Sequence, residues 1–154
     1  MIAEIKQTNL SEQIGCREQI LAFEEMMKEH PDAVEGNVMP LKHSFSPGIY
    51  MREVFLPKGM LLTGKIHRHE HPNVLLKGKI EMVTESGGVE TMQAPQAMIS
   101  PAGTKRVIHV LEDVVWITFH HNPNNETDID KLEKEIVVDN YTELPEAEQC
   151  LSLQ

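Results

Sequence analysis

The chain has 154 residues, the size of one domain, and can bury a sizeable core without disulfide or metal staples. Its net charge of −10 argues against nucleic acid as a partner, because phosphate binding needs a basic surface. No apolar run approaches the roughly 20 residues of a membrane span, and the start lacks the features of a signal peptide. Cys16 and Cys150 lie at opposite ends of the chain, so we interpret them as free thiols of a cytoplasmic protein.

The first predicted element is a helix near the N-terminus. Apolar side chains recur at helical spacing up to about Lys28, and Ser11 can cap the start of the helix. Pro31 disfavours helical geometry at the residue before it, so we expect the helix to end close to His30. The sequence therefore predicts a helical extension over residues 1–36.

Short β-strands are expected to fill the middle of the chain. Apolar or alternating runs are separated by turn signals such as Lys77-Gly78 and Glu112-Asp113. Many short strands with regular turns predict an antiparallel sandwich or barrel, here over residues 37–123. The predicted strands are 38–43, 49–56, 60–71, 74–76, 79–84, 89–93, 97–100, 106–110 and 114–121.

A second helix is expected in the C-terminal segment, residues 124–154. Thr127 or Asp128 can cap this helix, and apolar residues beginning at Ile129 follow at helical spacing. The tail from Asp139 is acidic and contains Pro145, which predicts a mobile segment or one that lies on the surface.

Three histidines at two-residue spacing stand out within the predicted strand 60–71. Successive side chains of a strand point to opposite faces, so His67, His69 and His71 would share one face. Neutral imidazoles held side by side are suitable ligands for a first-row transition metal. The alternative is a solvent-facing polar strand that is rich in histidine and binds nothing.

Two stretches together resemble the paired motifs of the cupin family. His67-x-His69, followed by Leu75-Leu76-Lys77-Gly78-Lys79-Ile80, is similar to the first cupin motif. Pro101-x-Gly103, followed by His109, is similar to the second motif. The resemblance implies a mainly β protein with a cupin-like double-stranded β-helix, a jelly-roll barrel with a helix added at each end. It also implies a metal near the barrel mouth, bound by two histidines and a carboxylate from the first motif and a histidine from the second.

This chain departs from the cupin pattern at the carboxylate of the first motif. Where the family has a glutamate, this sequence has Asn73 and Val74. Counting back from Gly78 instead places His71 at the glutamate position.

The second motif departs as well. Arg106 stands where a histidine usually follows Pro-x-Gly, and His109 comes three residues later. Either the site is retained, with His71 or Asn73 in the fourth position, or it has decayed. We favour a retained site, whose expected metal ligands are His67, His69, His71 and His109.

Replacing the carboxylate by an imidazole changes the expected chemistry. An all-imidazole shell leaves the full charge of a divalent ion, which makes a stronger Lewis acid and a better partner for an anionic ligand. Such a shell suits a divalent transition metal such as Fe, Ni, Zn or Mn better than Mg. Among cupins, three-histidine iron sites are associated with dioxygenases, so the resemblance implies dioxygenase- or isomerase-like chemistry on a small anionic molecule.

Three residues are candidates for binding that molecule: Asn73, Arg106 and His120. In the strand 114–121, Trp116 and His120 share one face and His121 lies on the other, so one of the two adjacent histidines points inward. The alternative for this histidine is a solvated position at the strand end. Arg106 could pair with an anionic substrate or form a surface salt bridge.

Two further functions compete with a metalloenzyme. The protein could be a non-catalytic cupin that binds a ligand as a sensor or accessory factor. It could also be an interaction protein encoded by a phage, because Thr118-Phe119-His120-His121 with the following segment 128–133 resembles small proteins of phage genomes. The terminal helices offer apolar faces for a homodimer, which cupins often form. Neither nucleic acid nor membrane is an expected partner.

Overall fold

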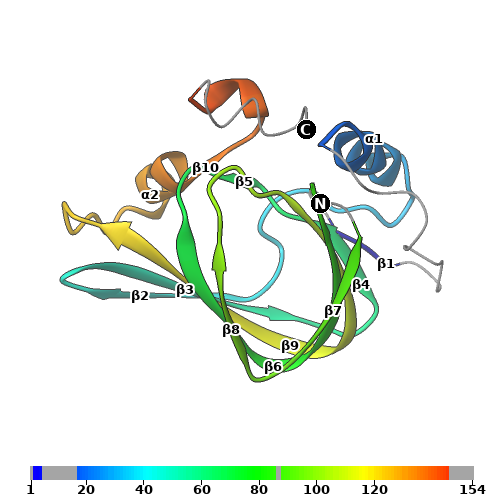
Figure 1. Cartoon of the computed structure of the whole chain (residues 1–154), viewed down its shortest axis with the longest axis horizontal. Coiled ribbons are helices and arrows are strands. Elements are labelled where there is room, and N and C mark those ends of the chain that lie inside the picture. Colours follow the sequence, from blue (N-terminus) through cyan, green and yellow to red (C-terminus); the bar gives the residue numbers. More distant parts are fainter. Residues whose placement is uncertain (1, 5–16, 86–87, 146–154) are drawn as a thin grey trace.

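The protein is built mainly from antiparallel β-strands (Figure 1). The computed structural model describes residues 2–4, 17–85 and 88–145, and over these ranges eight strands form one sheet and two short strands form another. The strands of the larger sheet are β1 (Ile2–Glu4), β2 (Leu41–Ser46), β3 (Gly48–Leu56), β4 (Met60–Thr63), β6 (His71–Thr84), β7 (Val89–Gln93), β8 (Gln96–Ser100) and β9 (Arg106–Asn122). The smaller sheet pairs β5 (Ile66–His67) with β10 (Val137–Val138).

Two long strands, β6 and β9, hold the larger sheet together. The two strands are antiparallel, so the N-terminal half of β6 pairs with the C-terminal half of β9, and the C-terminal half of β6 pairs with the N-terminal half of β9. Different strands flank these two paired regions. One half of the sheet has the order β2-β3-β9-β6-β8, and the other has β1-β4-β9-β6-β7. The sheet therefore rolls up around β6 and β9 into a jelly-roll barrel (Figure 1), which confirms the predicted fold class.

The turns predicted at Lys77-Gly78 and at Glu112-Asp113 are wrong, because β6 and β9 each run straight through them. The register between the two strands shifts here, as it does at a β-bulge. Gly78 has φ +90°, and a Cβ on it would lie 2.3 Å from the backbone oxygen of Asp113. Glycine therefore permits a close approach of two strands at this point rather than a reversal of the chain.

The predicted single strand over residues 60–71 is also wrong. It is divided into β4, β5 and the start of β6, and residues 68–70 bend between the last two. β5 pairs with β10 and not with the larger sheet, and the Arg68 backbone N–H extends this pairing by donating to the carbonyl of Ile136, 2.8 Å away. His67 and His71 consequently lie on different strands.

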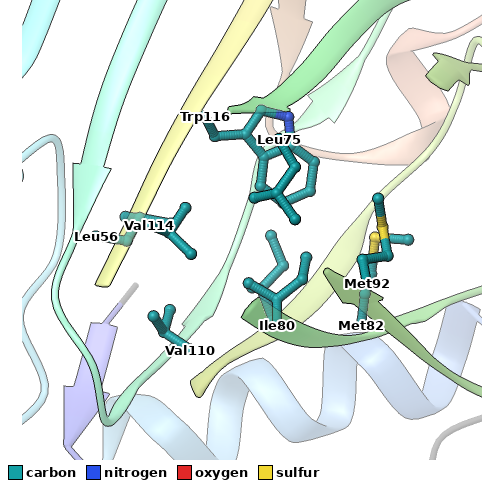
Figure 2. Packing of buried hydrophobic residues seen from close by; sticks show 9 residues of the cluster. Leu56, Leu75, Ile80, Met82, Met92, Val110, Val114 and Trp116 are labelled. Atoms are coloured by element: carbon teal, nitrogen blue, oxygen red, sulfur yellow. The ribbon is translucent and has the colours of Figure 1, made fainter. Parts of the chain in front are cut away.

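A hydrophobic core fills the space between the two halves of the rolled sheet (Figure 2). Its side chains come from β3, β6, β7 and β9 and point toward one another in Figure 2. Full burial of one such aliphatic side chain stabilises the fold by about 1.5–3 kcal/mol. The core residues are Leu56, Leu75, Ile80, Met82, Met92, Ile108, Val110, Val114 and Trp116.

The N-terminal helix α1 (Arg17–Lys28) packs on the outside of the barrel. Ile20 and Met27 contact buried residues of β4, β6 and β9. A buried ion pair adds to this contact, because Lys105 Nζ lies 3.0 Å from Glu24 Oε1 and donates to the carbonyl of Gly64 at 2.8 Å. The predicted cap Ser11 and both cysteines lie outside the described residues.

The C-terminal helix α2 (Ile129–Ile136) begins at its predicted cap. The Asp128 carboxylate accepts hydrogen bonds from the backbone N–H groups of Asp130 and Lys131 at 3.1 and 3.3 Å. No helix in the described ranges is long and apolar enough to span a membrane.

The segment after α2 packs against the barrel. β10 pairs with β5, and a 3₁₀ helix follows at Tyr141–Glu143. Most residues of the segment 139–145 are exposed, which agrees with the predicted surface position, but Leu144 is only 3% exposed and packs with Ile66 and Val138. The C-terminal segment therefore supports the strand that carries His67.

Candidate functional site: a histidine cluster beside a cationic cavity

Three histidine rings meet where β5, the start of β6 and the end of β9 come together. The ring centroids are 4.3 Å apart for His67 and His71, 4.8 Å for His71 and His120, and 5.7 Å for His67 and His120. Strand register explains why the rings of His71 and His120 are close. β6 and β9 are antiparallel and Asn73 pairs with Thr118, so the same register, extended by two residues, places His71 beside His120. His67, His71 and His120 together form the histidine cluster.

The hydrogen bonds of these rings leave two nitrogens without a partner. His71 Nδ1 donates to the backbone carbonyl of His69 at 3.1 Å, so its Nε2 carries the free lone pair. His71 Nε2 and His67 Nδ1 are both buried, and no hydrogen-bond partner for either lies in the described part of the chain. His120 Nε2 lies 2.9 Å from Thr118 Oγ1. Buried polar atoms normally find partners, so two orphaned nitrogens side by side point to a ligand.

The cluster is held in the uncharged state. Burial lowers the pKa of all three histidines, to about 3 for His120. After burial, proximity of His71 and His120 further lowers the pKa of His67, and the positive charges of Arg106 and Arg52 add to this effect. At neutral pH all three rings are therefore neutral imidazoles, the form that binds metal ions.

Two of the predicted metal ligands lie elsewhere. His69 is exposed in the bend between β5 and β6, and only its backbone carbonyl contacts the cluster. His109 lies between Ile108 and Val110, whose side chains enter the core, so His109 points to the opposite face of β9. Its Nδ1 lies 3.4 Å from Glu81 Oε2. The structure therefore does not bring His69 or His109 together with His67.

Asn73, a candidate for the fourth ligand position or for substrate binding, is part of the barrel wall. It is 1% exposed, donates to Ser100 Oγ at 2.6 Å and accepts from the indole N–H of Trp116 at 3.0 Å. Its side chain is thus engaged in fixing Ser100 and Trp116, and it does not line the cavity described next.

A cavity of about 410 Å³ adjoins the histidine cluster through His67. Its volume falls within the range of small-molecule binding sites, about 300–1,000 Å³. The wall is largely apolar and includes the ring of Trp116, with Arg52, Lys65 and Arg106 as cationic members. A smaller cavity of about 190 Å³ is lined by His120 and shares Arg52 with the first.

Arg106 is the most buried of these cations, at 9% exposure. One of its terminal nitrogens donates to Ser100 Oγ, and the guanidinium carbon lies 5.9 Å from the centroid of the Trp116 ring. Burial lowers the pKa of Arg106, although an arginine stays protonated in proteins. Within residues 2–4, 17–85 and 88–145 no carboxylate lies within 4.0 Å of it, so the surface salt bridge considered as an alternative is wrong.

Sequence reasoning found some members of the site and missed others. The alternation of β9 indicated that one of His120 and His121 points inward, and His120 is indeed buried while His121 is exposed. Tyr50, which stacks on His120 at 5.8 Å, and Arg52 gave no local signal. They enter the site only because β3 pairs with β9, a contact between segments far apart in the sequence.

Comparison with known proteins finds similarity to solved structures at low sequence identity. No protein-family model and no curated protein matches the sequence. The cupin-2 domain of a transcriptional regulator of the XRE family from Enterobacter cloacae is 17% identical with a TM-score of 0.47, over 57% of this chain and 100% of that one. A cupin-2 domain protein from Shewanella frigidimarina is 9% identical with a TM-score of 0.46, over 65% of this chain and 92% of that one.

An RmlC-like cupin with a double-stranded β-helix from Methanocaldococcus jannaschii is 10% identical with a TM-score of 0.45, over 58% of this chain and 86% of that one. The jelly-roll topology of this chain follows from its own strand pairing. The ligand chemistry must likewise come from its own residues.

Proposed function

We propose that the protein binds a divalent transition metal through His67, His71 and His120 and holds a small anionic molecule in the adjoining cavity. The observation that carries the proposal is the pair of orphaned nitrogens, on His67 and His71, within a cluster of neutral buried imidazoles. Nitrogen donors of this kind suit Fe, Ni, Zn or Mn. The cluster would supply such a site from residues that only partly match the cupin motifs.

Each histidine would have a distinct part in binding the ion. The bond from His71 Nδ1 to the carbonyl of His69 fixes the tautomer and turns Nε2 toward coordination, as the outer hydrogen bonds of metal-binding histidines do. His67 would present its buried Nδ1. As the side chains stand, no group of three or more His, Cys, Asp or Glu residues in the described ranges is arranged to hold an ion. Binding therefore requires rotation of a ring, for which His120 is suited, because its side chain has one hydrogen bond to the described residues, to the Thr118 hydroxyl.

The charge of the site favours an anionic ligand. A divalent ion with three neutral ligands keeps its full charge and would act as a Lewis acid toward an oxygen donor. The side chains of Arg106 and Arg52 add positive charge to the same cavity, inside a protein whose net charge is −10. This concentration of positive charge would attract a small anion and orient its charged group toward the histidines.

Metal titration of the untagged, chelator-treated protein tests the proposal. By calorimetry with Zn²⁺, we expect one tight site per chain in the wild type. We expect binding at least about tenfold weaker in His71→Ala and His120→Ala, because each loses a nitrogen donor. His69→Ala and His109→Ala are matched controls, since their side chains lie outside the cluster.

The variants must first be shown to be folded by their thermal unfolding curves. An absence of tight binding in the wild type would contradict the proposal. Loss of binding in His109→Ala with full binding in His71→Ala would also contradict it and would favour the ligand set predicted from the cupin motifs.

A further inference from the structure

The guanidinium of Arg106 is a buried cation that no carboxylate in the described ranges contacts, although the charges of Glu85 and Glu90 act on it from a distance and oppose the lowering of its pKa by burial. It is 9% exposed, its Nε is buried without an acceptor in the described ranges, and none of the ion pairs there involves it. A buried charge is costly unless it is paired and hydrogen-bonded. A residue that lowers the stability of the fold in this way is typical of a ligand-binding site.

Neighbouring side chains fix the direction of this guanidinium. Ser100 Oγ accepts a hydrogen bond from one terminal nitrogen of Arg106, and Ser100 is itself held by Asn73. Trp116 lies beneath the guanidinium and is also bonded to Asn73. Arg106 is therefore oriented before a ligand arrives, which lowers the entropy that binding must lose.

The charges around the cavity leave room for a single anionic group. Arg52 and Lys65 also line the cavity, and Glu133 is the one carboxylate among the described lining residues. Lys65 Nζ lies 3.7 Å from Asp139 Oδ1, so the charge of Lys65 already has a partner outside the cavity lining. Glu133 accepts a hydrogen bond from Asn37 at 2.8 Å, and Asn37 accepts one from Arg52 at 3.0 Å, so these three form a chain of their own. Arg106 has no place in that chain and is left for the ligand.

The rest of the wall is apolar and would contact the body of the ligand. A planar guanidinium fork matches the two oxygens of a carboxylate, and one cation without a paired carboxylate balances the single charge of a carboxylate rather than the two charges of a phosphate dianion. A hydrocarbon body fits the remaining surface, which includes an indole ring. The apolar lining residues include Met39, Val54, Leu56, Leu62, Ile108 and Trp116.

We propose that Arg106 binds the carboxylate of an organic monocarboxylate whose apolar body packs against Trp116 inside the barrel. This inference builds on the proposed function and names the class of the anionic ligand. It assigns the recognition of the carboxylate to the arginine, so that binding does not depend on a metal at the histidine cluster.

Trp116 gives a direct readout, because it is the single tryptophan of the chain and lines the cavity. Phenylacetate and its uncharged counterpart phenylacetamide are titrated into the full chain, with and without EDTA, and tryptophan fluorescence is recorded. We expect saturable quenching by phenylacetate in both conditions and binding of phenylacetamide at least about tenfold weaker, because a charge-assisted bidentate pair is lost.

Variants of Arg106 separate recognition from a structural role. We expect Arg106→Gln to weaken phenylacetate binding at least about tenfold and to remove the preference over phenylacetamide. Arg106→Lys keeps the charge without the fork and should bind with intermediate affinity. Lys58→Gln makes the same change of charge at an exposed residue outside the cavity and should bind as the wild type does.

Thermal unfolding of the ligand-free proteins completes the test. Removing a buried charge that has no carboxylate in contact should leave Arg106→Gln at least as stable as the wild type. A clearly lower unfolding temperature for this variant would show a structural role and overturn the inference, as would an absence of phenylacetate binding to the wild type. Undiminished binding by Arg106→Gln that requires metal and is lost in His71→Ala would overturn the inference while supporting the proposed function.

Discussion

Replacing Gly78 by alanine tests the close contact between β6 and β9 on which the rolled sheet depends. The new Cβ would lie 2.3 Å from the backbone oxygen of Asp113 and 2.9 Å from Val114 Cγ2. Neither neighbour is the flexible end of a long side chain, so the two strands would have to separate. Gly78 also has φ +90°, a conformation that costs a residue with a Cβ about 1–2 kcal/mol.

Gly48→Ala is the matched control for this substitution. Gly48 has φ +78° and no atom within 4 Å of the added Cβ, so it shares the conformational cost without the clash. We expect Gly48→Ala to lower the free energy of unfolding by about 1–2 kcal/mol. The overpacking at Gly78 adds about 1–3 kcal/mol, which gives a loss of about 2–5 kcal/mol for Gly78→Ala.

Urea unfolding followed by tryptophan fluorescence measures both losses. Because β6 and β9 carry His71 and His120, we also expect Gly78→Ala to weaken metal binding while Gly48→Ala leaves it unchanged. Equal stability of the two variants would refute the reasoning, since it would mean that the strands are not in contact at Gly78.

Three further predictions concern buried polar groups. In metal-free protein we expect stability to fall as the pH drops from 6.5 to 5, because the unfolded state takes up protons that folded His120, with a pKa of about 3, does not. His120 alone contributes a loss of about 2 kcal/mol in the free energy of unfolding over this range. The lowered pKa of His120 would be contradicted if the stability of the wild type did not fall, or if that of His120→Gln fell equally. Lys105→Met leaves Glu24 without its partner at 3.0 Å and should lower the free energy of unfolding by about 3 kcal/mol. Adding Glu24→Gln should restore part of this loss. Urea unfolding that shows no loss for Lys105→Met would refute a buried ion pair. Asn73→Ala removes the acceptor of the Trp116 N–H and should cost about 1–3 kcal/mol with a shift of the emission maximum, whereas an unchanged spectrum would argue against this bond.

The sequence predicted elements whose signals are local. The cap of α2 at Asp128 is a short-range pattern, and the alternation of apolar residues correctly indicated a β-barrel. The continuity of β6 and β9 was missed because a glycine such as Gly78 is equally compatible, in the sequence, with a turn and with a β-bulge. Only the approach of Asp113 from another strand distinguishes the two cases.

The same limit explains which histidines were placed correctly. Alternation of side chains holds within one strand, and the bend at residues 68–70 ends the strand between His67 and His71. The pairing of β5 with β10, which the Arg68–Ile136 hydrogen bond extends, joins segments far apart in the sequence. His109 was assigned from its distance to a motif, although its parity with Ile108 and Val110 on β9 decides its face.

The most direct test of the account is to locate the ion itself. Crystals of the untagged protein soaked with Co²⁺ and measured at the cobalt absorption edge give an anomalous difference peak at any bound ion. The account predicts one strong peak within coordination distance, about 2.1 Å, of nitrogens of His67, His71 and His120. A peak at His109 and Glu81, or a histidine cluster without any peak at saturating Co²⁺, would contradict it.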